Sequence, residues 1–245
     1  MPCEPLSIMK TPRLIASLLL LAAATVPAFA AFESARISPD NVLPRYPTSL
    51  TMAGITKGYA VVAVSIDSEG KVQDSLVLAY TQPQLARAAR DAVNEWTFIP
   101  ARLDGLAVPV RTELRFDFAV EGAVISSNLA NHFFHDGFDK LGDGAPVYRP
   151  GRLAELDEPP VRVAGEAPQY ATQALKAGVR GKVEVHFYID EQGGVRLPAV
   201  SAGEDPYLMD QALVAVRHWR FAPPTSNGRP VLIAAAQEFN FGGAR

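Results

Sequence analysis

Two of the four histidines of this chain lie close together, in a pattern that resembles a metal-binding cluster. The stretch "HFFHD" at residues 132–136 combines imidazole and carboxylate groups, which are common zinc ligands. A zinc site also needs further ligands at matched spacing on a rigid frame, and no cysteine or second histidine pair accompanies this stretch. We therefore interpret His132 and His135 as part of a solvated loop. His186 and His218 are expected on the polar surfaces of a strand and a helix.

The acidic stretches do not form a recognised site either. "DKLGDG" at residues 139–144 has closely spaced acids like a calcium loop, but it lacks the ordered oxygen ligands that end in a bidentate glutamate. "SIDSEG" at residues 65–70 is typical of a hairpin turn, because its aspartate recurs at Asp190 without the serine. The sequence shows no Gly-x-Ser-x-Gly elbow, phosphate loop or dinucleotide-binding glycine pattern. It therefore predicts no catalytic residue, no metal site and no cofactor.

An internal repeat explains most of the remaining pattern. Comparing the chain with itself at an offset of 123 residues pairs its two tryptophans, Trp96 in "WTFIP" and Trp219 in "WRFAP". The same offset pairs Asp67 with Asp190, Gly70 with Gly193, Leu85 with Leu208, Val93 with Val216, Gly105 with Gly228, Phe116 with Phe239 and Phe118 with Phe241. The chain therefore contains two copies of one module.

Each copy is expected to fold as a hairpin, a helix and a last strand. Apolar and polar residues alternate in "KVEVHFYI" at residues 182–189, which is typical of a half-buried strand, while Pro198 in the returning strand indicates an irregularity. The helix that follows carries an apolar stripe ending on the tryptophan, which we expect in the core, and Pro100 or Pro223 then blocks its continuation. The economical fold class is α+β, with a three-stranded antiparallel sheet packed on helix in each module.

The outer face of the first strand differs between the two copies. In the first copy it carries Tyr59, Val61, Ala63 and Ser65, and in the second Lys182, Glu184, His186 and Tyr188. The more apolar face is either a binding surface or a surface that docks against the other domain or the linker phenylalanines. We favour docking.

The first thirty residues are typical of an export signal. Lys10 and Arg13 precede the apolar run "LIASLLLLAAATV", and "AFA" provides a small-x-small cleavage site. We expect cleavage between Ala30 and Ala31, because the apolar run is shorter than the ~20 residues that cross a bilayer. Cys3 would leave with the signal, so we expect no disulfide framework. The net charge of −3 shows no basic excess, so nucleic acid is not an expected partner.

Taken together, these motifs resemble the TonB C-terminal domain. The first copy shows "PRYP", "GYAVVAVSIDSEGKV", "AVNEWTFIPA" and "LRFDF" in order, and the second shows "PQYA", "GKVEVHFYIDEQGGV", "AVRHWRFAPP" and "FNF". After the signal peptide expected at residues 1–30, the resemblance implies TonB C-terminal-like domains at 40–120 and 161–243, with a linker at 121–160.

The resemblance also implies a periplasmic, non-catalytic protein of the cell envelope, linked to transmembrane transport. In family members that act as energy transducers, the domain receives an extended peptide of an outer-membrane receptor beside its last strand, by β-augmentation. Carried over by position, the partner-binding edges are Glu113, Leu114, Arg115, Phe116, Asp117 and Phe118, and Ala235, Ala236, Gln237, Glu238, Phe239, Asn240 and Phe241. The expected partner is a protein or extended peptide, with a TonB-dependent outer-membrane receptor as one candidate.

Departures from the family pattern leave two other functions open. A full transducer keeps a membrane helix and a long proline-rich spacer, neither of which this sequence shows, and the second copy has Tyr170 followed by alanine where the first has Tyr46 followed by proline. One alternative is a membrane-anchored TonB-type energy transducer with an uncleaved N-terminal helix, and membrane contact is expected only in that case. The other is an envelope structural or assembly protein whose sheet edges pair with each other.

Overall fold

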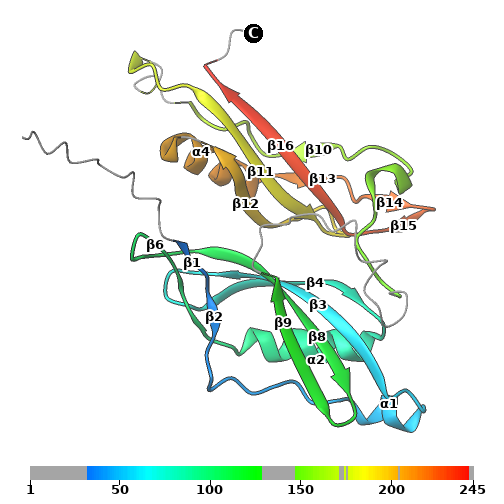
Figure 1. Ribbon diagram of the computed structural model, residues 1–245. Coiled ribbons are helices and arrows are strands. Elements are labelled where there is room, and N and C mark those ends of the chain that lie inside the picture. Colours follow the sequence, from blue (N-terminus) through cyan, green and yellow to red (C-terminus); the bar gives the residue numbers. More distant parts are fainter. Residues whose placement is uncertain (1–31, 129–146, 171–173, 175, 204, 243–245) are drawn as a thin grey trace, which may run out of the picture. The chain divides into compact units, whose positions relative to one another are not determined.

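The computed structural model describes residues 32–128, 147–170, 174, 176–203 and 205–242 (Figure 1). The expected cleavage site at Ala30 and Ala31, the histidine pair His132 and His135, and the acidic stretch at residues 139–144 lie outside these residues. Within them, the chain forms two modules, each with an antiparallel sheet and one long helix. The predicted α+β fold class is confirmed.

The first module is built on a four-stranded sheet. Its strands are β3 (Lys57–Ile66), β4 (Val72–Tyr80), β8 (Val110–Ala119) and β9 (Gly122–Asn128), in the order β4-β3-β8-β9. The helix α2 (Pro83–Asn94) covers one face of this sheet (Figure 1). The shorter elements are β1 (Phe32–Glu33), β2 (Arg36–Ile37), α1 (Thr48–Met52), β5 (Phe98–Ile99), β6 (Ala101–Leu103) and β7 (Leu106–Val108).

The second module repeats this plan with a three-stranded sheet. Its strands are β11 (Gly181–Ile189), β12 (Val195–Gly203) and β16 (Ile233–Phe241), in the order β12-β11-β16, and α4 (Pro206–Arg217) is its long helix. The shorter elements are η2 (Leu153–Glu155), β10 (Arg162–Ala164), β13 (Arg220–Phe221), β14 (Thr225–Ser226) and β15 (Arg229–Pro230). Asp205 caps α4, because its side chain accepts a hydrogen bond from the Leu208 amide at 3.1 Å.

Each module has its own hydrophobic core between sheet and helix, and each core contains its tryptophan. Trp96 and Trp219 are both 3% exposed, so the prediction that they are core residues is confirmed. Their indole nitrogens also donate hydrogen bonds to the segment that precedes the first sheet strand of each module. Trp96 Nε1 donates to the Val42 carbonyl at 2.9 Å, and Trp219 Nε1 donates to the Glu166 carbonyl at 2.7 Å. The repeated motif therefore also positions the start of each module.

The repeated aspartates form the hairpin turns, as predicted. One Asp67 oxygen accepts hydrogen bonds from the Glu69 and Lys71 amides, at 2.8 and 2.9 Å. Asp190 accepts from the Gln192 and Gly194 amides in the same way, at 3.1 and 2.6 Å. A carboxylate that accepts hydrogen bonds from two amides further along the chain holds the turn closed. These aspartates are therefore structural.

The returning strand β12 is irregular at Leu197 and Pro198. Its pairing with β11 shifts register between His186 and Tyr188, which is the position expected from the proline. Leu197 adopts φ = 48°, an uncommon conformation for a residue with a branched side chain, and it is 2% exposed. The predicted irregularity is confirmed. It directs the Leu197 side chain toward residues of the first module, where it is buried.

One strand was not expected. The composition of residues 121–160 predicts a linker, but residues 122–128 form β9 and pair with Glu113–Ala119 of β8. Among the described residues, the first sheet therefore has four strands, while the second has the expected three. A signal for β9 is present in the sequence, since Gly122 (φ = 151°) follows the last strand at a tight turn and leads into the β-branched pair Val124 and Ile125.

Candidate functional site

The edge proposed for partner binding in the first module is covered by the chain itself. β8 pairs with β3 on one side and with β9 on the other, so Glu113, Leu114, Arg115, Phe116, Asp117 and Phe118 lie inside the sheet (Figure 1). On the helix side, Ala123 and Ile125 of β9 pack against the core of the first module. The expectation of an open edge at β8 is therefore wrong, because the segment after the turn folds back as a strand.

Over most of its length, the corresponding edge of the second module has no partner strand among the described residues, although Ile233, the first residue of β16, forms an isolated parallel bridge with Gly151. β16 pairs with β11, and no second described strand pairs with it. The residues expected at this edge, Ala235, Ala236, Gln237, Glu238, Phe239, Asn240 and Phe241, all belong to β16.

The internal repeat makes the two edges directly comparable. Leu114 and Phe116 of β8 are 0% exposed beneath β9. At the equivalent positions of β16, Gln237 is exposed and Phe239 is only partly buried, although it packs against the core of the second module. The Phe239 ring lies 5.6 Å from the Trp219 ring, centroid to centroid. The second module therefore presents a partly uncovered aromatic side chain beside a stretch of strand edge that no described strand covers.

The outer face of β16 carries a paired charge. The Glu238 carboxylate lies 3.1 Å from the Lys182 ammonium, and both side chains are well exposed. The hydrogen bond from Lys182 and a second from Asn240 lower the pKa of the Glu238 carboxyl, so it is ionised at neutral pH. At the equivalent position β8 has Arg115, which pairs with Asp117 at 2.7 Å. The two edges thus differ in the sign of the charge at one matched position.

The apolar outer face of the first sheet packs against the second module. Tyr59, Val61 and Ala63 of β3 form one buried cluster with residues of β4 and of the second module: Leu76, Leu78, Ala79, Tyr188, Leu197 and Leu232. The interpretation of this face as a docking surface is therefore confirmed. Burial of apolar area of this kind stabilises an interface in rough proportion to the area removed from water.

Polar contacts surround this buried cluster. Arg111 donates a hydrogen bond to the Leu197 carbonyl at 2.7 Å and lies over the Tyr188 ring, 5.2 Å from its centroid. Tyr188 donates to the Glu113 carboxylate at 3.3 Å. Burial raises the pKa of the Tyr188 phenol, and the nearby Glu113 charge raises it further, so the phenol stays protonated. These groups hold the two modules together.

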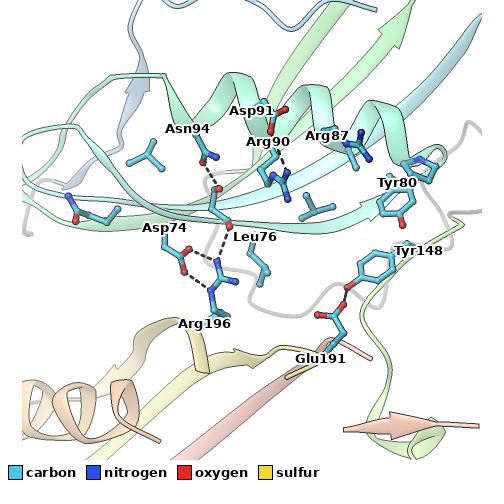
Figure 2. A pocket seen from close by; sticks show the side chains of 16 residues that line it. Asp74, Leu76, Tyr80, Arg87, Arg90, Asp91, Asn94, Tyr148, Glu191 and Arg196 are labelled. Carbon is cyan, nitrogen blue, oxygen red and sulfur yellow. Dashed lines mark hydrogen bonds and ion pairs between the residues drawn. The ribbon is translucent and has the colours of Figure 1, made fainter. Parts of the chain in front are cut away.

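A cleft of about 930 Å³ lies beside the same interface, between α2 and the β11–β12 hairpin (Figure 2). Its polar groups are largely paired with one another. Figure 2 shows the guanidinium group of Arg196 directed at the Asp74 carboxylate, where Nε donates to one oxygen at 3.0 Å and Nη2 donates to the other. It also shows the Tyr148 hydroxyl beside Glu191, to which it donates a hydrogen bond at 2.5 Å. Burial and the Glu191 carboxylate raise the pKa of the Tyr148 phenol. These pairs tie the modules together.

Replacing Arg196 by methionine should weaken the contact between the two modules. In Arg196→Met we expect the free energy of unfolding to fall by about 1 to 2 kcal/mol. Arg196 forms a bidentate ion pair with Asp74, and this pair is partly buried, with side chains 32% and 34% exposed. Urea denaturation measures this loss. Lys71→Met is the matched control, because the Lys71–Glu69 pair is 66% and 69% exposed and should contribute almost nothing. Equal effects in both variants would contradict the assignment of Arg196 to the interface.

Possible metal ligands and membrane spans were sought in the same part of the chain. No group of three or more histidine, cysteine, aspartate or glutamate side chains able to hold a metal ion occurs among the described residues. None of the helices formed by those residues has the length and apolar character needed to span a membrane. His186 contacts Glu184 on the outer face of β11, but its side chain is only 12% exposed, so the expectation of a surface position is not confirmed for this histidine.

One comparison with known proteins matches both copies of the repeat. A family model described as "Gram-negative bacterial TonB protein C-terminal" matches two segments, residues 42–120 and 166–242. Protein TonB of Vibrio cholerae is 31% identical over 77 residues, which cover 31% of this chain and 32% of that protein, so the match spans about a third of the relative's length. A solution NMR structure of the Pseudomonas aeruginosa TonB C-terminal domain shows 27% identity over 36% of this chain and 91% of its own, with a TM-score of 0.31.

Proposed function

Because the chain belongs to the family of the Gram-negative bacterial TonB protein C-terminal domain and contains that domain twice, we propose that it binds an extended segment of a protein partner at the free edge of β16. The bound segment would extend the second sheet by one strand. Backbone hydrogen bonds would supply affinity, and the side chains that face Phe239 and Phe241 would supply selectivity.

The observation that carries this proposal is the difference between the two edges. The β8 edge is occupied by β9, whereas the equivalent β16 edge pairs with no described strand beyond the Gly151–Ile233 bridge at its start and leaves Phe239 partly uncovered. In this account the first module is a docking platform, and the second module binds the partner. The cleft beside the interface plays no catalytic part, since its polar groups are engaged in pairs.

We place the protein in the periplasm after removal of residues 1–30, with a function in envelope transport. An outer-membrane receptor that presents an extended segment is the favoured partner, by analogy with the family. The mass of the mature N-terminus distinguishes this from a membrane-anchored transducer, since a protein that starts at Ala31 has no anchor in that segment.

Site-specific crosslinking tests the choice of edge. A photoreactive residue at Ala236 or Glu238 of β16, both exposed, should capture the partner in intact cells, with the crosslink mapped by mass spectrometry to an extended receptor segment. The matched controls are Glu113 and Arg115, which hold the equivalent positions of β8 beside β9. These should capture no partner. Capture from β8 but not from β16, or from neither strand, would overturn the proposal.

A further inference from the structure

We propose that the strand received by β16 lies antiparallel to it, carries a small residue and then an aliphatic one at alternate positions facing the helix, and has a basic residue on its other face. This inference rests on the proposed function, and it uses β9 as an internal example of how this edge is covered. The partner is thereby described by its chemistry, as an extended peptide of the form small-x-aliphatic-basic.

The example is valid because β8 and β16 have the same register in their sheets. Phe116 lies opposite Ala60 of β3, and Phe239 lies opposite Val183 of β11, so both members of each pair are shifted by the repeat offset. Every pair of the β11–β16 ladder has its counterpart in the β3–β8 ladder at this offset, including Gln237 with Val185 and Leu114 with Val62. A strand that fits beside β8 therefore meets β16 in a known register.

The helix-facing positions of β9 define the apolar part of the pattern. Ala123 lies opposite Phe118 and Ile125 lies opposite Phe116, and both β9 residues pack against the core. The equivalent residues of β16 are Phe241 and Phe239. A small residue opposite Phe241 leaves room for its ring, which contacts the Tyr170 ring at 5.6 Å between centroids. An aliphatic residue opposite Phe239 would cover the part of that ring which is now uncovered.

The other face of the strand defines the charged part. Ser126 of β9 lies opposite Arg115, and the position equivalent to Arg115 in β16 is Glu238. A lysine or arginine at the Ser126 position would face the Glu238 carboxylate in the second module but would face a guanidinium in the first. Opposite charges directly across two strands stabilise the pair, and like charges destabilise it. One basic residue would therefore direct a partner to β16 and away from β8.

A designed peptide tests this inference directly. The probe is a peptide of residues 121–128 with Ser126→Lys, added to the isotope-labelled full chain with a spin label at one peptide end. In the antiparallel arrangement, a label at the peptide N-terminus should broaden the amide signals of Phe241 and Gly242. A label at its C-terminus should instead broaden those of Ala235 and Ala236.

Peptide variants separate the contributions of the two faces. Ile125→Asp in the peptide should weaken binding at least about tenfold, because it places a charge against Phe239. Val124→Ser is the matched control, since Val124 is 71% exposed in β9, and it should change affinity less than about threefold. The unmodified sequence with Ser126 should bind more weakly than the lysine peptide, and added salt should reduce that difference.

The outcomes distinguish this inference from the function on which it rests. Broadening in the reverse order, or equal binding of the Ile125→Asp peptide, would overturn the antiparallel pattern while strand addition at β16 still stands. A partner crosslinked at Glu238 in cells, combined with no binding of the lysine peptide, would show that the stated chemistry is wrong. Absence of both the crosslink and the peptide signals would refute the proposed function itself.

Discussion

Replacing Gly193 by alanine is expected to destabilise the second module by about 3 kcal/mol or more. Gly193 has φ = +80°, and a Cβ atom added there would lie 1.9 Å from the Phe221 carbonyl oxygen. The obstacle is backbone and cannot rotate away. The Phe221 amide also donates a hydrogen bond to the Gly193 carbonyl at 2.8 Å, so a shift that relieves the clash would break the contact joining the hairpin to the segment after α4.

The repeat supplies both a duplicate and a control for this variant. Gly70→Ala should have the same effect on the first module, because its Cβ would also lie 1.9 Å from a backbone oxygen, that of Phe98. Gly228→Ala and Gly105→Ala also force a side chain into the left-handed region, with φ = +71° and +80°, but meet nothing within 4 Å. They should cost only about 1 kcal/mol. Similar unfolding free energies for all four variants in urea would contradict the close-approach explanation.

Replacing Ile125 by aspartate is expected to detach β9 and open the edge of β8. The side chain of Ile125 packs against the core beside Phe116, so a carboxylate there loses apolar contact and must recover its hydration. We expect a loss of about 2 to 4 kcal/mol in the stability of β9 against the sheet. Leu114 and Phe116, both 0% exposed in the native chain, would become accessible.

The functional consequence is a second binding edge. Titration of Ile125→Asp with the unmodified peptide of residues 121–128 should show two strand-binding sites for each chain, where the native protein shows one. Val124→Ser is the control in the protein as well, because the Val124 side chain is exposed on the opposite face of β9. Unchanged stoichiometry, with β8 amides still protected in Ile125→Asp, would show that β9 does not depend on this contact.

Much of the fold could be predicted from the sequence because the repeat doubles each signal. The alternation in β11, the helix stripes ending on Trp96 and Trp219, and the turn aspartates Asp67 and Asp190 all depend on local periodicity or local hydrogen bonds. The docking of the first sheet against the second module could also be predicted, because Val61 and Ala63 place apolar side chains on a face that would be polar if it were exposed.

The candidate site was harder to predict, because the exposure of a strand edge is a tertiary property. In sequence, β16 and β8 look like equivalent last strands of the two copies. They differ in whether a later segment folds back and pairs with the strand. β9 is short and adjoins a segment rich in glycine, proline and charge, so its composition suggested a linker. Likewise, the conformation of Leu197 follows from the bulge and the interface together, and no local pattern specifies it.

Amide hydrogen exchange along β8 and β16 is the most direct test of the account. In the full chain without ligand, consecutive amides of β8 should all be protected, because they point alternately to β3 and β9. From Ala235 to Phe241, beyond the Gly151–Ile233 bridge, every second amide of β16 should exchange rapidly, and these amides should become protected when the lysine peptide binds. Slow exchange of every β16 amide without peptide would contradict the account, since it would mean that this edge is already buried, as in an assembly protein.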